Sequence, residues 1–228
     1  MKILHFDDPA FARRDAEGPA QFVPGYPVMQ RMAAQLLSER AASDGAILVL
    51  GAGGGLELEA FARLQPGWRY VGVDPSAEML KNARERLDAA GAADRVTWVE
   101  GYVADAPEGP FDGATCLLTL HFVPDDGSKL ETLRQLRARL KPGAPFVLVD
   151  LCIDMGAPDQ EARRDRYARF ALESGADPDD VAQTRERLKA VLNCVSPARD
   201  EELLREAGFT DIDLFYAGLS WRGWSATA

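Results

Sequence analysis

Short apolar runs alternate with helical patterns along most of the chain. Five such runs predict strands, at residues 47–50, 69–73, 96–99, 111–120 and 145–151. The fourth run is nearly all apolar, as is typical of a strand buried on both faces of a sheet. Apolar residues at helical spacing predict intervening helices, at about residues 54–64, 75–90 and 126–140. We therefore expect an α/β fold with a mostly parallel sheet and helices on both faces.

The segment before the first strand has a different pattern. Residues 5–25 are rich in Asp, Arg, Pro and Gly, and we expect irregular structure or a short helix there. Residues 27–40 carry apolar positions at helical spacing and predict an amphipathic helix. We interpret residues 1–45 as an N-terminal helical lid that precedes a ligand-binding domain at 46–228.

The alternation also breaks after the fifth predicted strand. Two charged segments, at about 158–174 and 178–193, predict a helical cap inserted at about residues 156–195. The pattern then resumes with a helix at 198–207 and two strands, at about 210–216 and 219–226. We expect the cap and the N-terminal lid to close over the site and set its specificity.

A glycine-rich run follows the first predicted strand, and an acid ends the second. The run is Gly51-Ala52-Gly53-Gly54-Gly55, and the acid is Asp74. Glycine lets the backbone turn tightly and approach a ligand closely, and a carboxylate can accept hydrogen bonds from both ribose hydroxyls. This layout predicts a nucleoside site at the carboxyl ends of the strands. The alternatives are that the glycines only pack a helix against a strand and that Asp74 only caps the next helix.

The glycine spacing favours S-adenosylmethionine (SAM) over a dinucleotide. The pattern is G-x-G-G-G, whereas dinucleotide folds carry G-x-G-x-x-G and aim a helix N-terminus at a pyrophosphate. SAM has no phosphate, and it needs close backbone approach to its methionine part and a carboxylate for its ribose. We therefore expect SAM as the cofactor.

Four motifs resemble those of class I SAM-dependent methyltransferases. They are VLGAGGG at 49–55, GVDPSAEML at 72–80, LKPGA at 140–144 and AGF at 207–209. The resemblance covers about residues 46–228. It implies a Rossmann-like fold whose seven-stranded sheet ends in an antiparallel strand.

A narrower resemblance points to the carboxy-SAM synthase family. It is carried by VPGY at 23–26, LTLHFV at 118–123 and the segment 185–209. That family transfers a carboxyl-derived group from prephenate to SAM, and the product serves tRNA wobble-uridine modification. The resemblance implies a homodimer, with Tyr26 as a cofactor contact and Arg185 as a binder of a substrate carboxylate. That family has Asp where this chain has Val49 and Tyr102, and Asn where it has Leu117.

The candidate site residues follow from these motifs. The predicted cofactor-binding residues are Tyr26, Gly51, Ala52, Gly53, Gly55, Asp74, Pro75, Met79, Tyr102, Val103 and Leu117. Tyr102, just after the third strand, is expected to contact adenine, and the alternative is an ordinary core aromatic. Arg185 is the predicted substrate-binding residue, although it could equally be one of several solvated charges in its helix.

Two further residues are candidates for catalysis. His121 lies just past the fourth strand and could act as a base, or it could make structural hydrogen bonds in a loop. Asp150 ends the fifth strand and could hold substrate or take a proton, or it could be a structural acid. Trp221 and Trp224 on the last strand could line a pocket, but packing is the more common role for such residues.

Composition narrows the class of protein. The net charge is −10 and the isoelectric point is about 4.8. We therefore expect no direct nucleic-acid partner and no binding to anionic lipid, both of which need basic surfaces. No apolar run approaches the roughly 18 residues of a membrane span, and the N-terminus lacks a signal-peptide pattern. The scattered Cys116, Cys152 and Cys194 fit reduced thiols in a cytoplasmic protein, and no metal site is predicted.

The sequence thus favours a SAM-dependent methyltransferase that acts on a small molecule by in-line transfer. Two alternatives stay open. One is a transferase like carboxy-SAM synthase, which would use Arg185. The other is a non-catalytic SAM-binding module, which the loss of acids at Val49 and Tyr102 favours.

Overall fold

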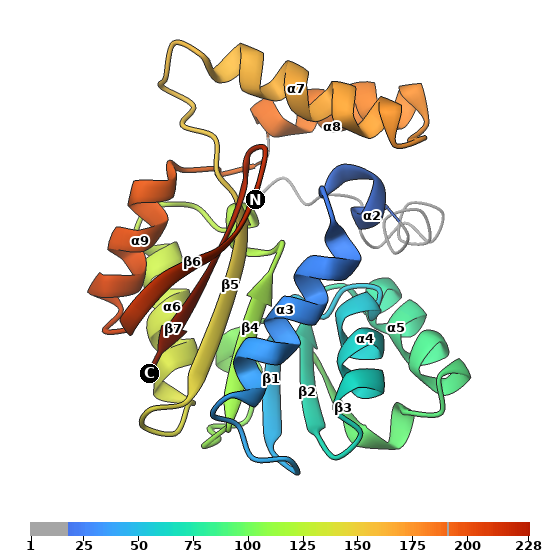
Figure 1. The fold of residues 1–228 in the computed structure, drawn as a ribbon, viewed down its shortest axis with the longest axis vertical. Coiled ribbons are helices and arrows are strands. Elements are labelled where there is room, and N and C mark those ends of the chain that lie inside the picture. Colours follow the sequence, from blue (N-terminus) through green and yellow to red (C-terminus); the bar gives the residue numbers. More distant parts are fainter. Residues whose placement is uncertain (1–17, 191) are drawn as a thin grey trace.

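The computed structural model describes residues 18–190 and 192–228. These residues build a seven-stranded sheet in the order β3-β2-β1-β4-β5-β7-β6 (Figure 1). The strands are β1 Ala46–Leu50, β2 Arg69–Asp74, β3 Val96–Glu100, β4 Gly113–Leu117, β5 Pro145–Leu151, β6 Thr210–Gly218 and β7 Trp221–Thr227. The first five strands pair in parallel, and β7 enters antiparallel between β5 and β6. The predicted sheet and its antiparallel last strand are confirmed.

Helices cover both faces of this sheet (Figure 1). They are α2 Pro19–Phe22, α3 Tyr26–Ser38, α4 Leu56–Leu64, α5 Ala77–Ala89, α6 Ser128–Ala138, α7 Gln160–Glu173, α8 Pro178–Ala190 and α9 Pro197–Glu206. The alternation of side chains along a strand explains the two layers. On β1, Ile47 and Val49 join the core under α3, α4 and α5, whereas Leu48 and Leu50 join the core under α6 and α9.

β4 is shorter than the apolar run at 111–120 predicts. Strand geometry ends at Leu117, because Leu118 takes a left-handed backbone conformation with φ 55°. Residues Leu120–Phe122 then form a 3-10 turn, called η3. The turn places His121 beyond the end of the sheet.

The N-terminal segment is only partly a lid. Residues 1–17, where much of the irregular segment was expected, lie outside the described residues. Helix α2 lies against α7, but α3 packs against α4 and β5, and its Met29, Ala33 and Leu37 are fully or almost fully buried in the core. Most of α3 therefore belongs to the body of the domain, and a lid role for α2 stays a prediction.

Helices α7 and α8 form the cap predicted after β5. They lie across the carboxyl ends of the strands (Figure 1). Buried apolar residues of the cap near α2 are Tyr167, Ala171, Ala176 and Val181. Over the described ranges, no helix is long and apolar enough to cross a membrane.

Candidate active site

A cavity of about 1060 Å³ lies where the strands β1, β2 and β4 end and the cap begins. Most of the residues predicted for a site line it. They are Tyr26, Gly51, Ala52, Gly53, Asp74, Pro75, Met79, Tyr102, Val103, Leu117 and His121. Gly55, Asp150 and Arg185 do not line it.

The glycine turn after β1 depends on a left-handed backbone. Gly51 has φ 78°, and a Cβ there would lie 1.9 Å from Thr119 Oγ1. The amides of Gly51 and Ala52 both donate to the carbonyl of Val73, at 2.8 and 2.9 Å. Any other residue type at Gly51 would need a strained backbone and a displacement of Thr119 or of the turn. With glycine, the turn presents bare backbone at the wall of the cavity.

Gly55 has a packing role instead of a cavity contact. It precedes α4 with φ 81°, and a Cβ there would lie 2.9 Å from the Cα of Ala83 on α5. The glycine lets the start of α4 approach α5 closely. The sequence leaves open whether the glycines pack a helix or line a ligand site. Gly55 packs a helix, whereas Gly51 and Gly53 line the cavity.

Asp74 holds the glycine turn to the end of β2. Its Oδ2 accepts from the Gly53 amide at 2.9 Å, and its Oδ1 accepts from the Ser76 amide at 3.0 Å. The N-cap of α5 is Ser76, whose hydroxyl accepts from the Met79 amide. Asp74 is therefore not the cap residue of that helix. A carboxylate offers about four acceptor positions, so it can hold the turn and also accept ribose hydroxyls.

Glu57 is a cavity residue that the sequence analysis missed. It is buried in the first turn of α4, and its Oε1 accepts from the hydroxyl of Thr115. Burial raises the pKa of Glu57 to about 8, and the Thr115 bond lowers it only in part. Thr115 pairs with Val49 across β1 and β4. The carboxyl group of Glu57 thus lies near Val49, the position at which the resemblance to the carboxy-SAM synthase family leads us to expect an Asp.

Tyr102 lies at the mouth of the site. Its side chain is 56% exposed and lines the cavity, so it is not a core aromatic. The nearby Asp105 accepts from the Tyr102 amide at 2.8 Å and does not line the cavity. Tyr102 and Leu117, at which the resemblance to the carboxy-SAM synthase family leads us to expect an Asp and an Asn, therefore present a ring and methyl groups to the cavity.

His121 and Asp150 form a buried pair. The Nδ1 atom of His121 lies 2.6 Å from Asp150 Oδ1, which also accepts from the His121 amide at 2.9 Å. Because an ionised carboxylate can only accept, we assign the proton to Nδ1. That assignment leaves Nε2 as an acceptor for a group bound in the cavity.

A buried lysine supports this pair. Lys129 donates to the carbonyl of Leu120 at 2.8 Å, and its ammonium lies 3.8 Å from Asp150 Oδ2. The ammonium therefore holds the η3 turn that carries His121 and offsets the charge of Asp150.

Asp200 and Cys152 lie behind the pair. Burial and the charge of Asp150 raise the pKa of Asp200 to about 8, and Cys152 Sγ donates to Asp200 Oδ2 at 3.3 Å. Burial also raises the pKa of the Cys152 thiol far above its ordinary value, which disfavours the reactive thiolate. Among the described residues, no cluster of His, Cys, Asp and Glu could hold a metal ion.

Aromatic rings line the part of the cavity under the cap. They are Phe22, Tyr26, Phe122, Tyr167 and Trp221. The Trp221 ring lies 5.6 Å from the His121 ring in an edge-on arrangement. Trp221 therefore both packs and lines the cavity, whereas Trp224 points to the other face of the sheet and donates to Glu201. Of these five, Phe22 and Tyr167 carry no signal in the local sequence pattern.

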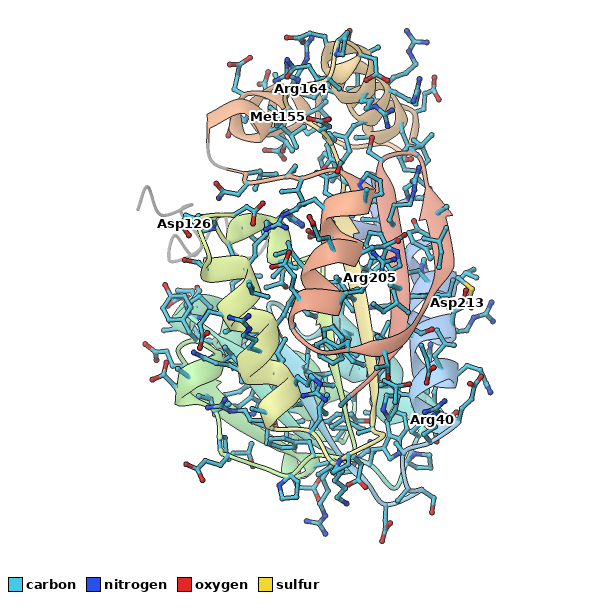
Figure 2. The ribbon with its side chains drawn as sticks, turned by 90° about the vertical axis from the view of Figure 1, so that its left-hand side faces the viewer. Arg40, Asp126, Met155, Arg164, Arg205 and Asp213 are labelled. Atoms are coloured by element: carbon cyan, nitrogen blue, oxygen red, sulfur yellow. The ribbon has the colours of Figure 1, made fainter. Side chains whose placement is uncertain are left out.

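Arg185 is directed to the acids of the cap. Its guanidinium pairs with Asp165 and lies 3.8 Å from Glu161. Arg164 on α7, labelled in Figure 2, is buried and also pairs with Glu161. Among the Lys and Arg residues whose side chains the structure describes, none lines the cavity.

Comparisons with known proteins connect this site to a family. A methyltransferase domain family matches residues 48–146. A carboxy-S-adenosyl-L-methionine synthase of Chromohalobacter salexigens is 30% identical over 204 residues, which cover 87% of this chain and 74% of that protein. The chain belongs to the class I SAM-dependent methyltransferase family.

Two further methyltransferases are similar. A ubiquinone biosynthesis O-methyltransferase of Xanthomonas campestris is 36% identical over 140 residues, or 60% of this chain and 55% of that protein. A solved SAM-dependent methyltransferase of Aquifex aeolicus superposes with a TM-score of 0.64 at 16% identity, covering 96% of this chain and 98% of that one. Other matching structures are longer, and this chain spans 59% of one of them. The fold is Rossmann-like, and the chain is a SAM-dependent transferase.

The residues of the cavity fit the family's cofactor, SAM. The left-handed turn at Gly51 and Gly53 presents backbone without side chains, as the methionine part requires. Asp74 supplies an acceptor for the ribose, and Glu57 supplies a carboxyl that can face an ammonium group. The volume lies at the upper end of the usual 300–1,000 Å³ of ligand sites, roughly enough for a cofactor and a small acceptor together.

Proposed function

We propose that this methyltransferase transfers a methyl group in line to a small-molecule acceptor, with His121 as the general base. The observation that carries the proposal is the His121–Asp150 pair at the wall of a cavity that also contains the glycine turn and Asp74. A base beside the cofactor site is needed only if the acceptor must lose a proton. The pair therefore favours chemistry over simple cofactor binding.

We propose that different residues at the strand ends contact different parts of the cofactor. Asp74 is positioned for the ribose hydroxyls, and the backbone of Gly51 and Gly53 for the methionine part. Glu57 is proposed to face the methionine ammonium, because a buried carboxyl is stabilised by an adjacent cation. Tyr102 and Leu117 are proposed to flank the adenine.

The chain's own contribution to the reaction is alignment and proton acceptance. SAM, when bound, supplies a methyl group that its sulfonium charge already activates. Nε2 of His121 accepts the acceptor's proton, and Asp150 stabilises the resulting imidazolium while holding the ring in one orientation. The cap excludes water from the cavity, which strengthens these interactions.

We also propose that the protein is a cytoplasmic homodimer that does not bind nucleic acid directly. The net charge of −10 supports the absence of a nucleic-acid partner. The dimer follows from the resemblance to carboxy-SAM synthases. Analytical ultracentrifugation would test it, and a single species at the monomer mass would contradict it.

A transferase like carboxy-SAM synthase is the second candidate. Its support is the 30% identity to such a synthase over 87% of this chain. A carboxylate substrate would need a cationic partner, and the candidate Arg185 pairs with acids of the cap instead of lining the cavity. The contacts in the structure therefore favour methyl transfer.

One experiment separates these candidates. The wild type and the His121→Gln and Arg185→Ala variants are incubated with SAM and either a panel of small acceptors or prephenate. Our account predicts release of S-adenosylhomocysteine with an acceptor, loss of this activity in His121→Gln, and retention in Arg185→Ala. Carboxy-SAM formed from prephenate and lost in Arg185→Ala would favour the synthase. SAM binding without turnover of any acceptor would favour a non-catalytic module.

A further inference from the structure

The part of the cavity next to His121 is built from aromatic rings of separate elements. Phe22 comes from α2, Tyr167 from α7 and Trp221 from β7. The Phe22 and Tyr167 rings lie 5.6 Å apart at 30°, and the Tyr167 and Trp221 rings lie 6.3 Å apart at 43°. Rings at these separations form faces and edges against which another flat ring can pack. We call Phe22, Tyr167 and Trp221 the aromatic wall.

The aromatic wall is fixed by a hydrogen bond as well as by packing. The indole nitrogen of Trp221 donates to the carbonyl of Phe22 at 3.1 Å. This bond links β7 to the segment that precedes α3. The wall is therefore preorganised, and a ligand that stacks on it need not order these rings first.

The charges around this part of the cavity disfavour an anionic acceptor. Arg164 on α7 and Arg185 on α8 both pair with Glu161 of the cap. The charged cap residue that lines the cavity, among those described, is Asp180. Among the described side chains that line the cavity there is no cation, so a carboxylate enclosed by them would lose its water without gaining a cationic partner, which is costly.

The base beside the wall disfavours an aliphatic alcohol. A neutral imidazole is an effective base only toward protons whose acidity is not far from its own. A hydroxyl on an aromatic ring meets this condition far better than a hydroxyl on a saturated carbon. His121 also lies edge-on to Trp221, so a ring packed on the wall would carry its substituent near the imidazole.

We propose that the acceptor is a planar, uncharged aromatic molecule with a ring hydroxyl. This proposal rests on the proposed methyl transfer and names its substrate class. The acceptor's O–H bond breaks as His121 takes the proton, and the oxygen forms a bond to the methyl carbon as the S–CH₃ bond breaks. The products are an aryl methyl ether and S-adenosylhomocysteine.

Binding to the product complex tests the proposal without requiring turnover. The protein is saturated with S-adenosylhomocysteine and titrated calorimetrically with three probes: 2-naphthol, 2-naphthoate and decahydro-2-naphthol. The second probe adds the negative charge of a carboxylate, and the third removes the flat rings. We expect 2-naphthol to bind at least about tenfold more tightly than either of the others, from lost stacking or from an unpaired charge. Tighter binding of 2-naphthoate, equal binding of the saturated probe, or no binding of 2-naphthol would overturn the proposal.

Variants of the wall identify the place of binding. Trp221→Leu should weaken 2-naphthol binding by about tenfold, whereas Trp221→Phe should retain most of it because a ring remains. Trp224→Leu is the matched control, since it removes a tryptophan from the same strand on the opposite face. Each variant must bind S-adenosylhomocysteine as the wild type does, which shows that it is folded. Equal losses in Trp221→Leu and Trp224→Leu would contradict the assignment.

Turnover separates this proposal from the function on which it rests. Methyl transfer to other acceptors but not to 2-naphthol, together with preferential binding of 2-naphthoate, would overturn the substrate class and keep the methyltransferase. Preferential binding of 2-naphthol with no methyl ether formed from it or from any other acceptor would keep the binding preference and overturn the function.

Discussion

The two ends of the cavity are built in different ways. The cofactor end is made of backbone and short polar side chains from the consecutive elements β1, α4 and β2, with Gly51 and Asp74 at its centre. The end at which we propose that the acceptor binds, called the acceptor end, is made of large rings from α2, α7 and β7. Its members Phe22, Tyr167 and Trp221 are far apart in the sequence. The first end can hold one kind of ligand, because its hydrogen-bonding geometry is fixed by the turn. The second end is built from side chains, so we expect a substitution of one of its rings or of a cap residue to change which acceptor it prefers.

The largest effect should come from the residue at the junction of the two ends. His121→Gln should lower turnover by about 10²- to 10⁴-fold, because it removes the base and leaves the cavity in place. SAM affinity should stay within about twofold of the wild type, since the cofactor end is unchanged. Steady-state kinetics and calorimetry on the same samples check both statements. A parallel loss of SAM affinity would mean that His121 belongs to the cofactor end.

The next effect tests the cofactor end directly. Asp74→Ala should weaken SAM binding by about 1.5–3 kcal/mol, the scale of hydrogen bonds to a charged group. Part of this loss comes from the glycine turn, because Asp74 also accepts from the Gly53 amide. Asp88→Ala is a control, since that exposed acid of α5 does not line the cavity. Unchanged affinity in Asp74→Ala by calorimetry would remove this residue from the site.

A substitution in the glycine turn should change the stability of the fold by a similar amount, and this change has two separable causes. Gly51→Ala should destabilise the fold by about 2–3 kcal/mol, because a left-handed backbone and a clash with Thr119 act together. Gly91→Ala has the same left-handed backbone, with φ 66°, but nothing within 4 Å of the new Cβ. It should cost only about 1–2 kcal/mol in urea unfolding. Equal costs for the two variants would show that Thr119 moves aside easily.

A further prediction concerns the pH dependence of stability and the buried acid of the cofactor end. The pKa of Glu57 is raised from 4.5 to about 8 by burial, so the folded state keeps this proton at pH values where the unfolded chain has lost it. The resulting stabilisation is fully present below about pH 4.5 and is lost as the pH rises toward about 8. Glu57→Gln cannot titrate, so its unfolding free energy should fall less over that range. The measurement is urea unfolding of the wild type and of Glu57→Gln at a series of pH values. If the unfolding free energies of the two proteins changed with pH in the same way, Glu57 would not be shielded from water.

The cofactor end could be predicted because its elements follow one another in the chain. The glycine run, Asp74 and the strands around them lie within a short segment, and their pattern predicts both the turn and the acid. Two details could not be read from that pattern. Gly55 faces α5 instead of the cavity, and Glu57 turns inward to Thr115, because both positions depend on how α4 packs.

The acceptor end could be predicted only in part. His121 and Asp150 were each identified at a strand end, and their contact follows from the pairing of β4 with β5. The early end of β4 depends on the left-handed Leu118, which an apolar run does not reveal. Phe22 and Tyr167 have no local signal, since only the folded cap brings them to Trp221.

The most direct test of the account is native mass spectrometry of the freshly purified protein, followed by denaturation to identify any released small molecule. We predict SAM or S-adenosylhomocysteine, one per chain, with less retained by Asp74→Ala and the same amount retained by His121→Gln. Release of carboxy-SAM, or a protein that stays empty when SAM is added, would contradict the assignment of this cavity as the site of a methyltransferase.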